Sequence, residues 1–271
     1  MALPPLNSFL VTEMIRGTRV SKLLGPFRKM PAVNLHALEE VLLRVSELVC
    51  ELPWIEELDI NPLIVDESGA IVADARIVVG QHAPVRGRYG HMAIHPYPAR
   101  LITTWQPPEG ELVTLRPIRP EDAEIEQAFV RSLSPESRRF RFMDTLRELT
   151  PAMLVRFTQI DYDREMAFVA TVQRDGKEVE VGVCRYITNP DGVTCEYAIV
   201  IADDWHRRGL GRRMMVQLIE VARRRGLAAM IGHVMSSNRG MLELCQALGF
   251  VISDSSDDPM VKRVTLALKD N

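Results

Sequence analysis

Apolar residues stand three or four positions apart between residues 35 and 49, and this spacing predicts an amphipathic helix. Asn34 is a suitable N-cap for the helix, and Pro53 ends it because proline cannot continue a helix. Strands are predicted over 55–60 and 70–79, with a turn at 66–69 between them. The first 80 residues therefore form a small α/β subdomain in this interpretation.

The periodicity is lost between residues 81 and 111. This stretch holds five prolines and three glycines, and no helical or strand spacing survives in it. We expect a linker over 81–111, with Tyr89, Tyr97 and Trp105 docked on a neighbouring surface.

A second domain is predicted over 112–271. A strand at 113–118 and helices at 121–131 and 150–160 come first. Three strands follow at 166–173, 178–188 and 193–202, joined by Asp-Gly pairs that indicate hairpins. A helix over 209–225, a strand over 229–235, a helix over 239–248 and strands near 250–252 and 261–268 complete it.

Composition and charge narrow the classes of function. The 271 residues suit one large domain or two modest ones, and 46% hydrophobic with 25% charged residues is ordinary for a globular protein. The net charge is −3, and neither the first 105 residues nor the remainder is basic, so we expect no nucleic-acid partner. No apolar run approaches the roughly 18 residues of a membrane span, so we expect no membrane partner.

The cysteines indicate the compartment. Cys50, Cys184, Cys195 and Cys245 show no CxxC spacing, so we expect no metal site and reduced thiols. The N-terminus has no basic segment before an apolar one, which argues against a secretory signal. These features predict a cytoplasmic protein.

The strongest chemical signal is a turn between a strand and a helix. An apolar strand runs directly into His206-Arg207-Arg208-Gly209-Leu210-Gly211. A helix N-terminus leaves backbone N–H groups unpaired, and glycines let that backbone approach an anion closely. With Arg212 adding charge, the turn predicts a diphosphate site; a plain turn with solvated arginines is the alternative. Neither a Walker loop nor a dinucleotide fingerprint fits, since position 214 is Met and no Gly-Lys-Ser/Thr follows.

Residues 112–268 resemble the GNAT acetyltransferase family, whose phosphate loop usually reads Gln/Arg-x-x-Gly-x-Gly/Ala. His206 departs from the first position, and both glycines match. The resemblance implies the GNAT fold, an α/β (α+β) domain with a mixed, mainly antiparallel central sheet and flanking helices. It also implies acetyl-CoA as cosubstrate, with the diphosphate on the amides of 207–212 and the pantetheine arm along the backbone of 199–201.

A second motif agrees with the first. Ser237-Asn238-Arg239-Gly240-Met241, followed by Leu248-Gly249-Phe250, resembles the family's Asn-x-x-Ala/Met…Gly-Phe stretch. It implies that Asn238 holds the CoA arm from the other wall of the cleft, and Asn238 also suits a helix N-cap. The expected cofactor-binding residues are Ile199, Val200, Ile201, His206, Arg207, Arg208, Gly209, Leu210, Gly211, Arg212, Ser237 and Asn238.

Glu196 is the candidate general base. It interrupts an apolar strand a few residues before the phosphate loop, where partial burial is expected to raise its pKa. Acetyl transfer needs a neutral amine, and a free lysine has a pKa of about 10.4, so a base must accept its proton. Relatives in the family use a glutamate at this place; the alternative is a glutamate paired with Arg185 across the strands.

The candidate for general acid is weaker. Many relatives carry a tyrosine on the last helix, and Cys245 stands at that position here. A thiol can donate a proton, but a small buried packing residue is the favoured interpretation. Without an acid, the CoA thiolate takes its proton from water.

Residues 1–80 resemble the end of the ATP-grasp part of nucleotide-forming acyl-CoA synthetases. The matching stretches are 57–63 and 73–76, in which Asn61 and Asp74 correspond to ligands of Mg-nucleotide. The first half of that unit is missing, so we interpret both residues as structural. An ATP-grasp tail ahead of a GNAT domain resembles bacterial protein lysine acetyltransferases of the Pat type, which implies an acceptor lysine on a metabolic enzyme such as acetyl-CoA synthetase.

Three functions remain open on the sequence alone. The first is a protein lysine N-acetyltransferase with direct transfer and Glu196 as base. The second is a GNAT enzyme for a small amine or protein N-termini, and the third is a non-catalytic regulatory module that binds CoA thioesters.

Overall fold

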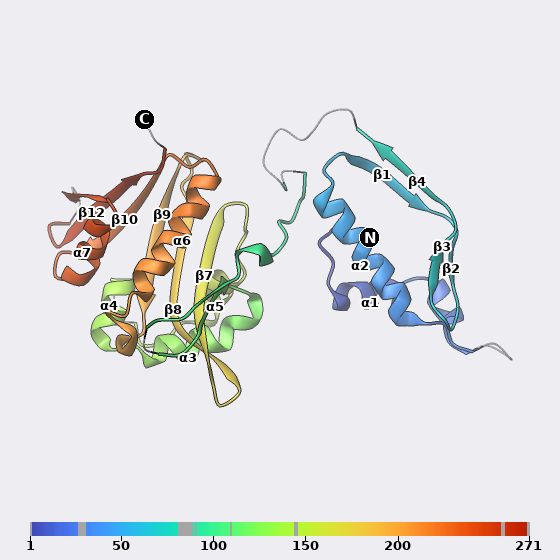
Figure 1. The fold of residues 1–271 in the computed structure, drawn as a ribbon, viewed down its shortest axis with the longest axis horizontal. Coiled ribbons are helices and arrows are strands. Elements are labelled where there is room, and N and C mark those ends of the chain that lie inside the picture. Colours follow the sequence, from blue (N-terminus) through green and yellow to red (C-terminus); the bar gives the residue numbers. More distant parts are fainter. Residues whose placement is uncertain are drawn as a thin grey trace. The chain divides into compact units, whose positions relative to one another are not determined.

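The computed structural model describes residues 2–26, 31–80, 89, 91–108, 110–143, 146–255 and 258–269. The chain divides into two compact units, Met1–Pro96 and Tyr97–Asn271. Each unit has its own sheets and helices, and each is described by itself below (Figure 1).

The first unit combines helices with two short antiparallel strand pairs. Its elements are α1 (Ser8–Arg16), η1 (Val20–Leu23), α2 (Leu35–Glu51), β1 (Ile55–Ile60), β2 (Leu63–Val65), β3 (Ala70–Val72) and β4 (Ala75–Val79). β1 pairs with β4, and β2 pairs with β3. The predicted N-cap of α2 is confirmed, since Asn34 Oδ1 accepts a hydrogen bond from the Ala37 amide at 3.0 Å.

The strand predicted over 70–79 is wrong in one respect, because it is divided at residues 73–74. There the Ala73 amide donates to Pro62 O, and the Asn61 amide donates to Asp74 O, both at 3.1 Å. The main chain of 61–62 therefore bridges the two strand pairs into one bent ribbon.

The second unit contains one large sheet with helices on both faces. Its elements are η2 (Ala99–Leu101), β5 (Thr103–Trp105), β6 (Val113–Pro117), η3 (Pro120–Asp122), α3 (Ala123–Ser132), α4 (Pro135–Phe142), α5 (Pro151–Thr158), β7 (Glu165–Arg174), β8 (Lys177–Thr188), β9 (Thr194–Ile201), η4 (Asp203–Trp205), α6 (Leu210–Arg224), β10 (Ala229–Met235), α7 (Arg239–Ala247), β11 (Val251–Asp254) and β12 (Val261–Ala267). The predicted meander of three strands is confirmed as β7, β8 and β9.

The sheet has the strand order β11-β12-β10-β9-β8-β7-β6-β5. Its neighbouring strands are antiparallel except β9 and β10, which run parallel. Parallel neighbours need a crossover connection, and α6 supplies it (Figure 1). The expected mainly antiparallel sheet is confirmed.

Alternate side chains of β8 identify what covers each face. Cys184 Sγ lies 3.8 Å from the carbonyl of Met214 in α6, so Cys184 faces α6. Arg185 donates to the carbonyl of Phe157 in α5 at 3.1 Å, so the next position faces α5. The two faces of the sheet therefore carry α6 on one side and the α3–α5 group on the other.

Residues 97–111 belong to the second unit rather than to the predicted linker. Gln217 of α6 fixes this segment, because its Nε2 donates to Leu101 O at 2.8 Å and its Oε1 accepts from Thr103 Oγ1 at 3.2 Å. β5 is three residues long, too short for the sequence pattern to reveal it. Residues 81–88 and 90 of the predicted linker lie outside the described residues.

Two acidic side chains are buried between α3 and β8. Glu126 is 2% exposed and Glu180 is 4% exposed. Within the described part of the chain, Glu126 Oε2 and both carboxylate oxygens of Glu180 have no hydrogen-bond partner. Burial raises the pKa of Glu180 well above its usual value, and the charge of Glu126 raises it further.

Candidate functional site

β9 and β10 run side by side for only three residues. Thr194, Cys195 and Glu196 lie opposite Ala229, Met230 and Ile231. Beyond Glu196 both strands continue, but their pairing does not. The sheet therefore opens between β9 and β10 directly after the predicted base.

The backbone groups of β9 that face this opening can be identified from its pairing with β8. The Ala202 amide donates to Val181 O at 2.9 Å, and the Asn189 amide donates to Thr194 O at 2.8 Å. Every second residue of an antiparallel strand bonds its neighbour, so 194, 196, 198, 200 and 202 bond β8. Ile199 and Ile201 consequently direct their peptide groups toward the opening, whereas Val200 directs its own toward β8.

His206 closes the end of this strand. Its Nε2 lies 3.0 Å from the carbonyl oxygen of Ile201. The His206 ring therefore already bonds the Ile201 carbonyl, which is one of the backbone groups expected to bond the pantetheine arm. The peptide groups of Ile199 and the amide of Ile201 are the ones left for an extended ligand.

The turn into α6 has the backbone of an anion site. Arg207 and Gly209 both have positive φ, at 60° and 90°. Gly209 is the N-cap of α6 and provides no side chain to the first turn. The first amide bonded back into the turn is that of Arg213, which donates to Gly209 O at 3.1 Å. The amides of 210–212 have no acceptor within the helix and point out of its N-terminus.

The side chains around this turn fit a diphosphate. Arg207, Arg208 and Arg212 are exposed, and the Arg208 guanidinium lies over the Trp205 ring at 5.4 Å. A Cβ added to Gly209 would meet nothing closer than Trp105, at 3.8 Å, so an open space lies over the turn. Arginine charge, unpaired amides and open space together are what an anion requires.

Ser237 and Asn238 lie between β10 and α7, and α7 packs near the turn. A Cβ on Gly211 would lie 3.5 Å from Leu244 Cδ2 and 3.7 Å from Ile201 Cγ1, so α7 packs beside the start of α6 and the end of β9. Asn238 caps α7, since its Oδ1 accepts from the Met241 amide at 3.1 Å. Ser237 precedes it and is exposed.

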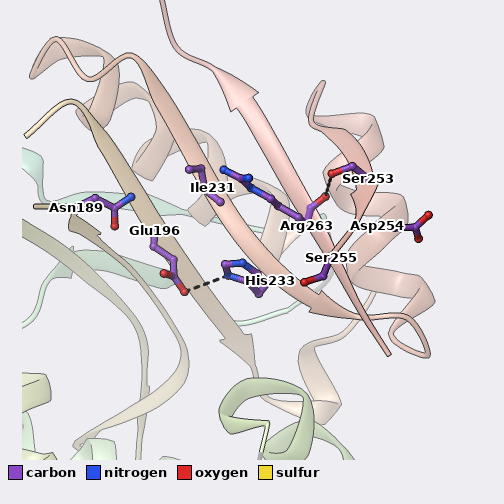
Figure 2. Close-up of a pocket in the computed structure, with 8 residues that line it drawn as sticks. All are labelled: Asn189, Glu196, Ile231, His233, Ser253, Asp254, Ser255 and Arg263. Atoms are coloured by element: carbon purple, nitrogen blue, oxygen red, sulfur yellow. Dashed lines mark hydrogen bonds and ion pairs between the residues drawn. The ribbon is translucent and has the colours of Figure 1, made fainter. Parts of the chain in front are cut away.

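Glu196 lies at the edge of a pocket of about 430 Å³ (Figure 2). The pocket is lined by Asn189, Glu196, Ile231, His233, Ser253, Asp254, Ser255 and Arg263. The Glu196 side chain is 55% exposed, and its Oε1 lies 3.4 Å from His233 Nδ1. The expected partial burial of Glu196 is therefore wrong, because the widening sheet leaves its carboxylate in solvent.

Arg185 is not the partner of Glu196. Arg185 lies opposite Ala198 in the β8–β9 register, is 5% exposed and bonds Phe157 O. The partner is His233, which is not among the predicted site residues. In the sequence, His233 is a polar residue in an otherwise apolar strand. Only the parallel register of β9 and β10 places it near Glu196.

Cys245 lies inside the protein, where its Sγ is 3.0 Å from the hydroxyl oxygen of Tyr197. Burial raises the pKa of the Cys245 thiol. The Tyr197 ring lies over Gly232, where an added Cβ would be 2.4 Å from ring atom Cε1. Tyr197, Gly232 and Cys245 thus fit one another, which favours a packing role for the cysteine.

Asp203 connects the phosphate turn to α4. Its carboxylate accepts hydrogen bonds from the Ser134 amide and hydroxyl, both at 2.8 Å, and from the Ser137 hydroxyl at 2.6 Å. Burial alone would raise the pKa of Asp203, but the bonds from Ser137 and Ser134 outweigh it and lower that pKa. The N-terminus of α4 is therefore fixed to η4, immediately before the turn.

Asn61 and Asp74 contact each other only through the main chain in the described structure, and both are exposed. No group of three or more metal-ligating side chains occurs among the described residues. Within that same part of the chain, none of the helices is both long and apolar enough to cross a membrane. The four cysteines are free and buried.

Comparison with known proteins agrees with this division of the chain. Residues 124–250 match the acetyltransferase (GNAT) family model, and residues 1–79 match an ATP-grasp domain model. An acetyltransferase of Pseudomonas aeruginosa is 45% identical over 150 residues, which are 55% of this chain and 81% of that protein. The acetyltransferase Pat of Mycolicibacterium smegmatis is 28% identical over 159 residues, which are 58% of this chain and 45% of Pat.

The first unit has a different set of relatives. It is 39% identical over 75 residues to the beta subunit of an ADP-forming acetate–CoA ligase of Pyrococcus furiosus, covering 28% of this chain and 32% of the subunit. For the second unit, the crystal structure of the GNAT domain of S. lividans PAT superposes with a TM-score of 0.58 at 24% identity. That similarity covers 64% of this chain and 99% of the PAT domain, and it supports the GNAT fold.

Proposed function

The chain belongs to the GNAT acetyltransferase family and is an N-acetyltransferase, and we propose that it transfers acetyl from acetyl-CoA to a lysine ε-amine of a partner protein. The observation that carries the proposal is the end of β9–β10 pairing at Glu196, with unpaired amides of α6 at the far end of β9. An acyl carrier lying along Ile199 and Ile201 would place its reactive end beside the Glu196 carboxylate.

The diphosphate is proposed to bind at the start of α6. The amides of 207–212 donate to its oxygens, and Arg207, Arg208 and Arg212 add positive charge. Leu210 and Gly211 contribute their amides rather than side chains. His206 supports the turn by bonding Ile201 O and does not need to touch the ligand.

The pantetheine arm is proposed to lie between the separated strands. Backbone groups of Ile199 and the amide of Ile201 bond it from the β9 side, while Val200 keeps that strand paired with β8. Ser237 and Asn238 contact it from the start of α7. Acetyl-CoA, when bound, supplies an activated acetyl group on a thioester.

Glu196 is proposed to accept the proton of the acceptor amine. A lysine with a pKa of about 10.4 is almost fully charged at neutral pH and has no lone pair for attack. Once the amine is neutral, a C–N bond forms to the acetyl carbon, the C–S bond breaks, and the nitrogen loses its second proton to solvent to give the amide. The exposed position of Glu196 lets the proton pass to water.

Cys245 is not proposed as the acid. Its sulfur is buried against Tyr197, and burial makes the thiol a weaker acid. The thiolate that leaves is proposed to take its proton from solvent.

The proposed acceptor is a metabolic enzyme of the cytoplasm, of the acetyl-CoA synthetase kind. Two similarities support this proposal: the relationship to Pat, and the ATP-grasp unit related to an acetate–CoA ligase. This chain spans 45% of the length of Pat and 32% of the length of the ligase subunit.

The test is transfer from isotope-labelled acetyl-CoA in the presence of a purified acetyl-CoA synthetase, followed by mapping of modified lysines by mass spectrometry. We expect labelled lysines on the synthetase, and we expect the label to be lost when the chain carries Glu196→Gln. Label found only on small amines or on protein N-termini would instead support a GNAT enzyme that acts on those amines. Tight binding of acetyl-CoA with no transfer to any amine would overturn the proposal.

A further inference from the structure

We propose that Arg263 binds a carboxylate on the acceptor, so that the site prefers a lysine with an aspartate or glutamate two positions away. This inference rests on the proposed function, because it concerns the acceptor peptide of that reaction. Arg263 would be a specificity-determining residue in the pocket that also contains Glu196.

The strand register places Arg263 in one row with the predicted base. Glu196 lies opposite Ile231 on β10, and His233, two residues further on β10, lies opposite Arg263 on β12. Neighbouring strands are about 4.8 Å apart, so β9 and β12 are separated by about 10 Å. In Figure 2 the Arg263 side chain extends back across β10 toward Ile231, on the Glu196 side of the pocket.

The charges around the pocket leave Arg263 without a protein carboxylate. Glu196 lies beside His233, and Asp254 forms an ion pair with Lys262. Figure 2 shows the Asp254 side chain pointing away from the other labelled residues. Arg263 forms no ion pair with any residue that the structure describes, and its side chain is exposed.

A guanidinium in this position suits a carboxylate better than a neutral group. Its planar N–H fork matches a carboxylate with two parallel hydrogen bonds. In an extended peptide, residues i and i+2 project to the same side and are about 6.7 Å apart. A lysine that reaches Glu196 therefore presents the side chain two positions away toward Arg263.

The matched experiment uses peptides that differ in one residue. A lysine peptide with glutamate two positions from the lysine is compared with the same peptide carrying glutamine or lysine there. We expect kcat/KM for the glutamate peptide to exceed that for the glutamine peptide about tenfold, mainly through KM. Arg263→Gln should remove this preference, and Arg263→Glu should reverse it toward the lysine-flanked peptide.

Lys262→Gln is the control variant. Lys262 neighbours Arg263 on β12, but its ammonium pairs with Asp254 and it does not line the pocket. It should retain the preference for the glutamate peptide, whereas a general effect of lost positive charge would weaken the preference equally in both variants.

The outcomes separate this inference from the proposed function. Equal kcat/KM for the glutamate and glutamine peptides in the unchanged chain would overturn the inference while leaving lysine acetylation standing. Absence of transfer to any peptide or protein lysine would overturn both. A free amino acid could instead be acetylated at its α-amine faster than the corresponding amino-acid amide, with Arg263→Gln removing this difference. That result would overturn the preference for an acidic peptide and would show that Arg263 binds an α-carboxylate.

Discussion

Glu196 Oε1 lies 3.4 Å from Nδ1 of His233, which is two residues beyond Ile231, the β10 partner of Glu196 at the last β9–β10 pair. The two side chains come from strands that run parallel and lie on the face opposite α6 and α7. This contact holds a carboxylate at the opening of the sheet, and it is the feature on which the predictions about catalysis depend.

Glu196→Gln should lower kcat by about 10²- to 10⁴-fold, the usual contribution of a general base. The affinity for CoA should stay the same, because the diphosphate turn lies at the other end of β9. Steady-state kinetics and calorimetric titration with CoA measure the two quantities. Asp254→Asn, which changes a carboxylate that Figure 2 shows pointing away, is the control and should retain activity. Full activity of the Glu196 variant across the pH range would contradict the assignment of the base.

His233→Phe should reduce kcat by about two- to tenfold, the rate equivalent of one lost hydrogen bond. The phenyl ring fills similar space but provides no nitrogen to the Glu196 carboxylate. When Glu196 is already replaced by Gln, His233→Phe should have no further effect on kcat. The measurement is kcat of the two single variants and of the double variant. Equal effects of His233→Phe in both backgrounds would show that the histidine acts independently of the glutamate.

Gly209→Ala should weaken CoA binding and destabilise the second unit. Gly209 has φ of 90°, a conformation that costs a residue with a Cβ about 1–2 kcal/mol. Thermal denaturation and CoA titration report the two effects. Gly69→Ala is the control, since Gly69 has no positive φ and nothing within 4 Å of an added Cβ. An unchanged affinity for CoA in Gly209→Ala would remove the turn from the cofactor site.

Cys245→Ala should leave turnover nearly unchanged. The variant removes one sulfur from a buried site beside Tyr197, which should cost about 1 kcal/mol of stability. Turnover measured at a temperature where the variant is fully folded separates chemistry from stability. A thousandfold loss of kcat in a folded variant would make Cys245 the acid after all.

Glu180→Gln should change how stability depends on pH. Burial and Glu126 raise the pKa of Glu180, so the folded chain holds this proton more tightly than the unfolded chain. The resulting stabilisation is complete below the unfolded-state pKa of about 4.3 and is lost as pH rises through the folded-state pKa. The Tm of the unchanged chain should therefore fall more between pH 5 and pH 9 than that of the variant.

Glu178→Gln is the opposite case on the same strand. Its hydrogen bond with Arg116 lowers the pKa of Glu178, so its stabilisation is present above the unfolded-state pKa and is lost as pH falls through the lower folded-state value. This variant should be less stable than the unchanged chain at pH 7. Identical pH profiles of Tm for Glu180→Gln and the unchanged chain would contradict the role given to the buried acids.

The meander, the α6 turn and the Asn34 cap were predictable because each has a local signal: alternating residues with Asp-Gly turns, a glycine pair, and a side chain that bonds a nearby amide. β5 and the break at 73–74 were not predictable, since both depend on partners far along the chain. Glu196 was predicted as a site residue because it is a charge inside an apolar strand. His233, Tyr197 and Arg263 were missed because only the strand register gives them their neighbours.

The Asp203 contacts connect two elements of the second unit, η4 before the α6 turn and the N-terminus of α4. Asp203 grips Ser134 and Ser137 from a position just upstream of the α6 turn, so α4 and that turn form one mechanical piece. These hydrogen bonds fix the first residues of α4 to the chain that leads into the α6 turn, so the orientation of α4 and the position of the turn depend on the same carboxylate.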